Sequence, residues 1–136
     1  MENITNVASM FLECKNLTSI DLSNKKINYS KSESESESNS KSKKKVFNCS
    51  SMFFNCLSLK SVNLENFTLM KIEKMDYMFY KCKSLKHINL KNLKFKKDEE
   101  NKLPSINNIF FGVNKKCKIE VENDKIKDEF NKIKNK

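Results

Sequence analysis

The segment that decides the fold runs from Asn48 to Leu64 and reads N-C-S-S-M-F-F-N-C-L-S-L-K-S-V-N-L. Two other segments align with it without gaps: N-V-A-S-M-F-L-E-C-K-N-L-T-S-I-D-L from Asn6 to Leu22, and K-M-D-Y-M-F-Y-K-C-K-S-L-K-H-I-N-L from Lys74 to Leu90. All three share the frame M-F-x-x-C-x-x-L-x-x-[IV]-x-L, and a degenerate fourth copy begins at Ile106. This internal repetition predicts a single domain, residues 1–136, in which successive repeats stack on one another.

The repeats are unevenly spaced along the chain. Met52 and Met78 lie 26 positions apart, whereas Met10 and Met52 lie 42 positions apart. The excess coincides with residues 28–45, N-Y-S-K-S-E-S-E-S-E-S-N-S-K-S-K-K-K, in which Tyr29 is the one apolar side chain. This composition predicts a disordered, low-complexity insertion in a connecting loop. Its Ser-Glu run is interpreted as a hydrophilic linker, with phosphorylation as the alternative.

Each repeat has two halves with different hydrophobic periods. In the first half the apolar positions step by three, three, one and three, at Ile72, Met75, Met78, Phe79 and Cys82. This stripe predicts one face of a helix. The period then changes to two, at Ile88 and Leu90, which predicts a short strand with one buried face. A helix and a strand in every repeat predict an α/β fold of about four helix–strand repeats with parallel strands.

The C-terminal region predicts a closed end for the stack of repeats. The segment from Lys116 to Val121 alternates polar and apolar residues and is expected to be the last strand. Residues 122–136 are expected to form a capping helix whose apolar face carries Ile126, Phe130 and Ile133. Asp124 is the expected N-cap of this helix.

The repeat frame, together with L-E-N-F-T-L-M-K-I-E-K-M from Leu64 to Met75, resembles the BspA-like leucine-rich repeat surface proteins. Asn66-Phe67 and Asn92-Leu93 occupy the N-F position of that family's repeat. The resemblance implies a leucine-rich repeat solenoid that acts in adhesion or protein interaction without catalysis, as a whole protein or as a piece of a longer array. It also implies a cell-surface or extracellular location. The start of the chain has no basic, apolar secretory signal, so a cytoplasmic location is the alternative.

The composition excludes several classes of function. The chain contains one glycine and one histidine, too few for a phosphate-binding glycine loop or for most acid–base sites, so we expect no enzyme, cofactor, metal or small-molecule substrate. The formal net charge is +10, and all 27 basic residues are lysine. Because arginine, the usual residue for reading bases, is absent, a nucleic-acid partner is not expected. The alternative function is weak, non-specific and salt-sensitive binding of polyanions.

Three cysteines, Cys14, Cys56 and Cys82, occupy the same position in successive repeats. Such a column suggests either a metal or redox site, or a small buried residue where a larger one would clash. Because neighbouring helices lie about 8–10 Å apart, the column is too widely spaced for disulfides, and we interpret it as part of the core.

The candidate binding surface is the outward side of the strands, where parallel pairing would place polar side chains from all four repeats on one face. These residues are Ser19, Asp21, Ser61, Asn63, His87, Asn89, Lys118 and Glu120. We expect this face to bind a protein partner, with ordinary solvated surface as the alternative. His87 is expected to be a surface histidine with Asn89 and Ser61 as neighbours.

Overall fold

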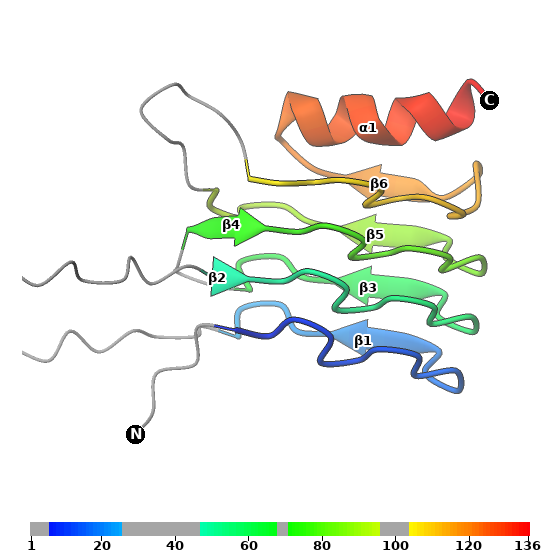
Figure 1. Ribbon diagram of the computed structural model, residues 1–136, viewed down its shortest axis with the longest axis horizontal. Coiled ribbons are helices and arrows are strands. Elements are labelled where there is room, and N and C mark those ends of the chain that lie inside the picture. The colour runs from blue at the N-terminus through cyan, green and yellow to red at the C-terminus, as the bar shows by residue number, and fades with distance from the viewer. Residues whose placement is uncertain (1–5, 26–46, 68–70, 96–103) are drawn as a thin grey trace, which may run out of the picture.

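The computed structural model describes residues 6–25, 47–67, 71–95 and 104–136; the predicted insertion at 28–45 lies outside them. The fold is α/β, with short parallel strands in two sheets and one C-terminal helix (Figure 1). The elements are β1 (Ser19–Asp21), β2 (Phe47–Asn48), β3 (Ser61–Asn63), β4 (Ile72–Lys74), β5 (His87–Asn89), β6 (Lys118–Glu120) and α1 (Asp124–Lys134).

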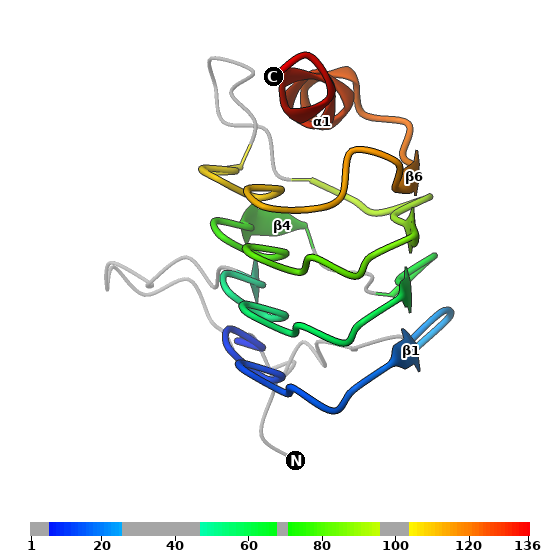
Figure 2. The ribbon, with the colours of Figure 1, turned by 90° about the vertical axis from the view of Figure 1, so that its right-hand side faces the viewer.

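The predicted strands are confirmed and form one parallel sheet in the order β1-β3-β5-β6. Val62 lies opposite Ile20 on one side and Ile88 on the other, and Ile88 lies opposite Ile119. Equivalent positions of the repeats are therefore in register, and their apolar side chains point to the same interior. Figure 2 shows each repeat as one coil of the chain, with the coils stacked above one another.

The helices predicted inside the repeats are wrong. In the described residues these segments form consecutive turns, with β2 and β4 paired as a second small parallel sheet beside them. Ser51 and Asn55 have φ values of 55° and 58°, a left-handed conformation that a right-handed helix cannot contain. Cys56 N–H donates to the carbonyl of Phe53 at 3.2 Å. A series of such turns returns every third or fourth residue to the core, which is the spacing that also signals a helix.

Hydrogen bonds between coils replace those that a helix would form within itself. Phe11 N–H donates to the carbonyl of Met52 at 2.9 Å, and Phe53 N–H donates to that of Met78 at 2.9 Å. Phe79 N–H continues the ladder to the carbonyl of Ile109 at 3.0 Å. In each of these bonds the N–H group points to the next coil and the carbonyl to the preceding one.

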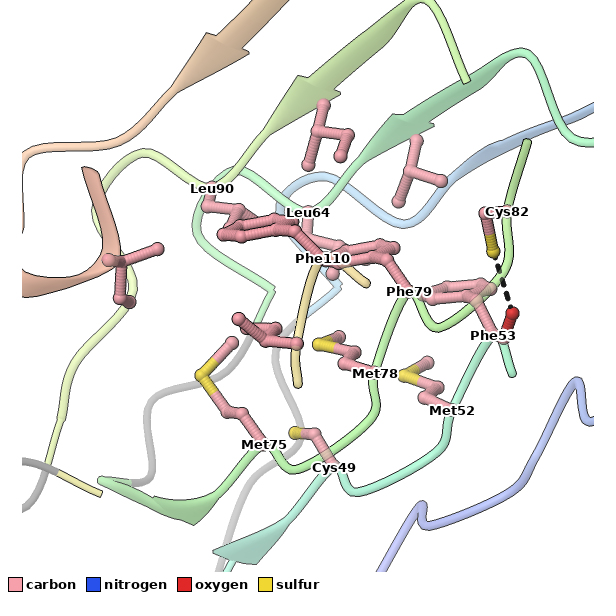
Figure 3. Close-up of a cluster of buried hydrophobic side chains, with 14 of the residues drawn as sticks. Cys49, Met52, Phe53, Leu64, Met75, Met78, Phe79, Cys82, Leu90 and Phe110 are labelled. Atoms are coloured by element: carbon pink, nitrogen blue, oxygen red, sulfur yellow. Dashed lines mark hydrogen bonds between the residues drawn. The ribbon is translucent and has the colours of Figure 1, made fainter. Parts of the chain in front are cut away.

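The core is a narrow column between the two sides of the coil (Figure 3). Its centre is a stack of phenylalanine rings in which Phe53 lies 5.4 Å from Phe11 and 5.6 Å from Phe79, with interplanar angles of 2° and 4°. Phe110 extends the stack at 5.9 Å from Phe79. The Met-Phe pair of each repeat thus supplies one layer of the core, and the stack exists because the repeats are in register.

The predicted C-terminal helix is confirmed, and it lies against the last coil (Figures 1 and 2). Ile126 and Phe130 are buried, and the Phe130 ring meets the Phe110 ring edge to face at 5.3 Å. The predicted N-cap was wrong by one residue. Asn123, not Asp124, accepts a hydrogen bond from Ile126 N–H at 3.2 Å, and Asp124 lies in the first turn, where its charge favours the helix dipole.

Among the described residues, no helix is both long and apolar enough to cross a membrane.

Candidate interaction surface

Parallel pairing brings all eight predicted surface residues together on one side of the sheet, which we call the strand face. They fall into two columns that differ in their contacts. The first column is Ser19, Ser61, His87 and Lys118, and the second column is Asp21, Asn63, Asn89 and Glu120.

The side chains of the second column mostly form hydrogen bonds within the chain. The side-chain oxygens of Asp21, Asn63 and Asn89 each accept the backbone N–H two residues further on, at 2.8, 3.2 and 3.1 Å. These local bonds end each strand in the same turn, as Asx side chains commonly do. The side chains also bond between coils, since Asn63 Nδ2 donates to Asp21 Oδ2 at 3.4 Å and Asn89 Nδ2 donates to Glu65 Oε2 at 3.2 Å.

The expectation that Asn89 belongs to an exposed face was wrong. It is 7% exposed, because its neighbours cover it on both sides and its amide is engaged at both ends. The sequence contained a signal of this role, since Asp21, Asn63 and Asn89 repeat a short side chain that bonds its own backbone at one position.

We expect Asn89→Ala to lower the free energy of unfolding by about 1–3 kcal/mol, because it leaves the Lys91 N–H and the Glu65 carboxylate without their partner. Ser61→Ala, in the first column, should change it by less than about 0.5 kcal/mol. Urea titrations followed by circular dichroism would measure both values. Equal effects would contradict the division of the strand face into two columns.

His87 lies opposite Ser61 in the strand register, as expected, and also has a carboxylate partner that the sequence did not predict. Its Nε2 lies 2.5 Å from Glu120 Oε1, while Lys91 Nζ lies 2.5 Å from Glu120 Oε2. Ser61 pairs with His87 only through the strand register. Hydrogen bonding and charge from Lys91 first, then from His87, lower the pKa of Glu120 below its usual 4.5. The same contact with Glu120 raises the pKa of Lys91 above its usual 10.5.

These pKa shifts predict how stability depends on pH. Because the folded pKa of Glu120 is lowered, its stabilising contribution is present above pH 4.5 and disappears as the pH falls through the folded value. Because the folded pKa of Lys91 is raised, its stabilising contribution is present below pH 10.5 and disappears as the pH rises through the folded pKa.

Glu120→Gln should therefore destabilise the chain at neutral pH, and the difference from the wild type should shrink to nothing in acid. Urea unfolding at neutral pH and in acid would measure the difference in free energy of unfolding, with the variant at an exposed carboxylate, Asp128→Asn, as control. A difference that persists in acid would show that the ion pairs are not its cause.

The cysteine column lies in the core, with a polar contact that the sequence does not predict. Cys56 Sγ donates to the carbonyl of Phe11 at 3.0 Å, and Cys82 Sγ donates to that of Phe53 at 2.9 Å (Figure 3). Both residues are fully buried, whereas Cys14 in the first coil is half-buried. Within the described ranges, no three His, Cys, Asp or Glu side chains gather as a metal site would require.

Burial also determines how the thiols react. It raises the pKa of Cys49 and Cys82 to about 12, and that of Cys117 to about 11. The thiolate is the reactive form, and Cys14 is half-buried whereas the other four cysteines are buried. We therefore expect Cys14 to react with a disulfide reagent in the native protein at pH 8 before any other cysteine. Mass spectrometry of the labelled peptides would locate the label. Labelling of Cys82 as fast as Cys14 would contradict the closed core.

The geometry described so far defines a class: a repeat protein whose in-register strands present one polar face. Residues 1–119 match the family described as "Mycoplasma protein of unknown function, DUF285", and the chain belongs to this family. No curated protein and no solved structure shows detectable similarity to this chain.

Proposed function

We propose that the chain is a non-catalytic protein-interaction or adhesion module, built as a leucine-rich repeat solenoid of the BspA-like type. Its first column of the strand face is the contact surface for a protein partner. In this proposal the protein acts at the cell surface, as the resemblance of its repeats implies.

The observation that carries this proposal is the contrast between the two columns. The side chains of Ser19, Ser61 and Lys118 have no hydrogen-bond or ion-pair partner among the described residues. Adjacent parallel strands lie about 4.8 Å apart, so Ser19 and Ser61 are neighbours, whereas His87, which contacts Glu120, lies between Ser61 and Lys118. Unengaged polar side chains at fixed positions can contact a partner without first breaking internal bonds, which lowers the cost of binding.

The proposal is tested with neutral substitutions that enlarge the first column. Ser19→Gln/Ser61→Gln adds bulk without changing charge, and Ser58→Gln/Ser84→Gln makes the same change in the segments that precede β3 and β5. Biolayer interferometry against a panel of purified extracellular and cell-surface proteins would identify binders and measure their affinities.

We expect at least one protein in the panel to bind the wild type and to lose about tenfold in affinity with the first variant, but not with the control. Equal affinities of the two variants for every binder, or no binder tighter than about 1 mM, would contradict the proposal.

A further inference from the structure

A depression of about 520 Å³ lies at the C-terminal end of the strand face, where the chain enters β6 beside the last turn of α1. Beside Cys117 and Ile119, its lining residues are His87, Lys115, Lys116, Lys118, Glu120 and Lys134. The lining therefore combines three segments: one from β5, one from the end of the fourth repeat, and one from the helix.

The charges around this depression are strongly unbalanced. The lining contains four lysines and one carboxylate residue, Glu120. None of these four lysines forms an ion pair with another described residue. Glu120 does not neutralise them, because its two oxygens are already held by His87 and by Lys91 from outside the lining.

Two contacts hold parts of these lysines in place, the side chain of Lys134 and the backbone of Lys116. The Lys134 ammonium lies over the Phe130 ring, 5.0 Å from its centre. The backbone of Lys116 is fixed by a 2.9 Å hydrogen bond from its N–H to Asn114 Oδ1. Like charges gathered around a concave surface raise the local positive potential, and a multiply charged anion is the ligand that such a potential concentrates.

We propose that this depression binds a compact ligand that carries several phosphate groups. Lysine binds phosphate as a point charge and needs no planar fork, which suits a chain whose cations are all lysine. A volume of about 520 Å³ lies within the range of small-ligand sites. The inference rests on the proposed function in one respect. His87, Lys118 and Glu120 also belong to the strand face, so the depression would be the part of that face that contacts an anionic group.

This site differs from a general attraction caused by the net charge of +10. General attraction would depend equally on lysines anywhere on the surface. A defined site depends on the lysines of the lining, and two matched variants separate these cases. Lys115→Gln/Lys116→Gln removes two charges from the depression, and Lys15→Gln/Lys25→Gln removes two charges from the first coil.

The probe is inorganic tripolyphosphate, added to the ¹⁵N-labelled full chain and followed by NMR, with sulfate at the same ionic strength as the reference anion. We expect saturable shifts of the backbone amides from Lys115 to Glu120 with tripolyphosphate, and much weaker ones with sulfate. The Lys115→Gln/Lys116→Gln variant should bind about tenfold more weakly, whereas the first-coil variant should change by less than about twofold.

Two outcomes would overturn the proposal: equal weakening in both variants, or shifts spread over the whole surface without saturation. The four substituted lysines, Lys15, Lys25, Lys115 and Lys116, are exposed and lie outside strands and helices, and an unchanged unfolding midpoint would verify that each variant is folded. The test is separate from that of the proposed function. The Ser19→Gln/Ser61→Gln variant leaves the lining intact, so it can lose its protein partner and still bind tripolyphosphate.

Discussion

Phe79→Ala is expected to lower the free energy of unfolding by about 3–5 kcal/mol, a large part of the total stability of a domain of this size. Phe79 is 0% exposed and lies in the middle of the ring stack, 5.6 Å from Phe53 and 5.9 Å from Phe110. Its removal leaves a cavity that neither neighbouring coil can fill, because the backbone ladder fixes the distance between coils. Urea unfolding followed by far-UV circular dichroism would measure the loss.

Phe111, the residue that follows the buried Phe110, offers a matched control outside the core. Phe111 stacks on Tyr80 at 5.0 Å, but it is 50% exposed. We expect Phe111→Ala to cost less than about 1.5 kcal/mol, since less apolar surface returns to water and no cavity forms. A comparable loss for the two variants would mean that the inner stack contributes no more than a surface pair.

Phe130→Ala is expected to have the second large effect, also about 3–5 kcal/mol. Phe130 is 1% exposed and joins α1 to the stack through its edge-to-face contact with Phe110. Without it, the last coil loses its cover and exposes apolar side chains that other coils bury against their neighbours. Asp128→Ala, on the exposed side of the same helix, should change stability by less than about 0.5 kcal/mol.

Hydrogen exchange would distinguish two ways in which Phe130→Ala can act. If α1 is part of the cooperative unit, the amides of β5 and β6 should lose protection together with those of the helix. Faster exchange confined to the helix would contradict the role of α1 as the cap of the stack.

The fold was predictable from sequence wherever one repeat could be checked against another. The strands at Val62 and Ile88 and their register follow directly from the alignment, because parallel in-register stacking is the arrangement that buries the same position of every repeat. The turns were not predictable by the same reasoning. Left-handed residues such as Ser51 and Asn55 interrupt the helix without changing the hydrophobic spacing, so periodicity alone could not distinguish turns from a helix.

The candidate surface was predicted in outline but not in its contacts. The alternation of the strands places the eight residues on one face, as observed. It does not show that Asn89 is buried, because that depends on the Glu65 side chain of the preceding coil. Nor does it reveal the contact between His87 and Glu120, which joins the third repeat to the degenerate fourth one. Glu120 stands where the earlier repeats carry Asp21, Asn63 and Asn89, so those shorter side chains gave no precedent for its contact with His87.

The one-way ladder between coils has a consequence for how such a chain can lengthen. Phe11, Phe53 and Phe79 all donate their N–H groups in the same direction along the stack, so the turn side of each of these coils has a donor edge and an acceptor edge. The strand side donates in both directions, since Lys60 N–H donates to the Thr18 carbonyl and Leu22 N–H to the Asn63 carbonyl. A tandem duplication of one repeat in the gene would insert a coil whose two edges match those on either side. A new coil can therefore be inserted between two existing coils with the terminal helix left in place, whereas the turn sides of two stacks could not pair acceptor edge to acceptor edge.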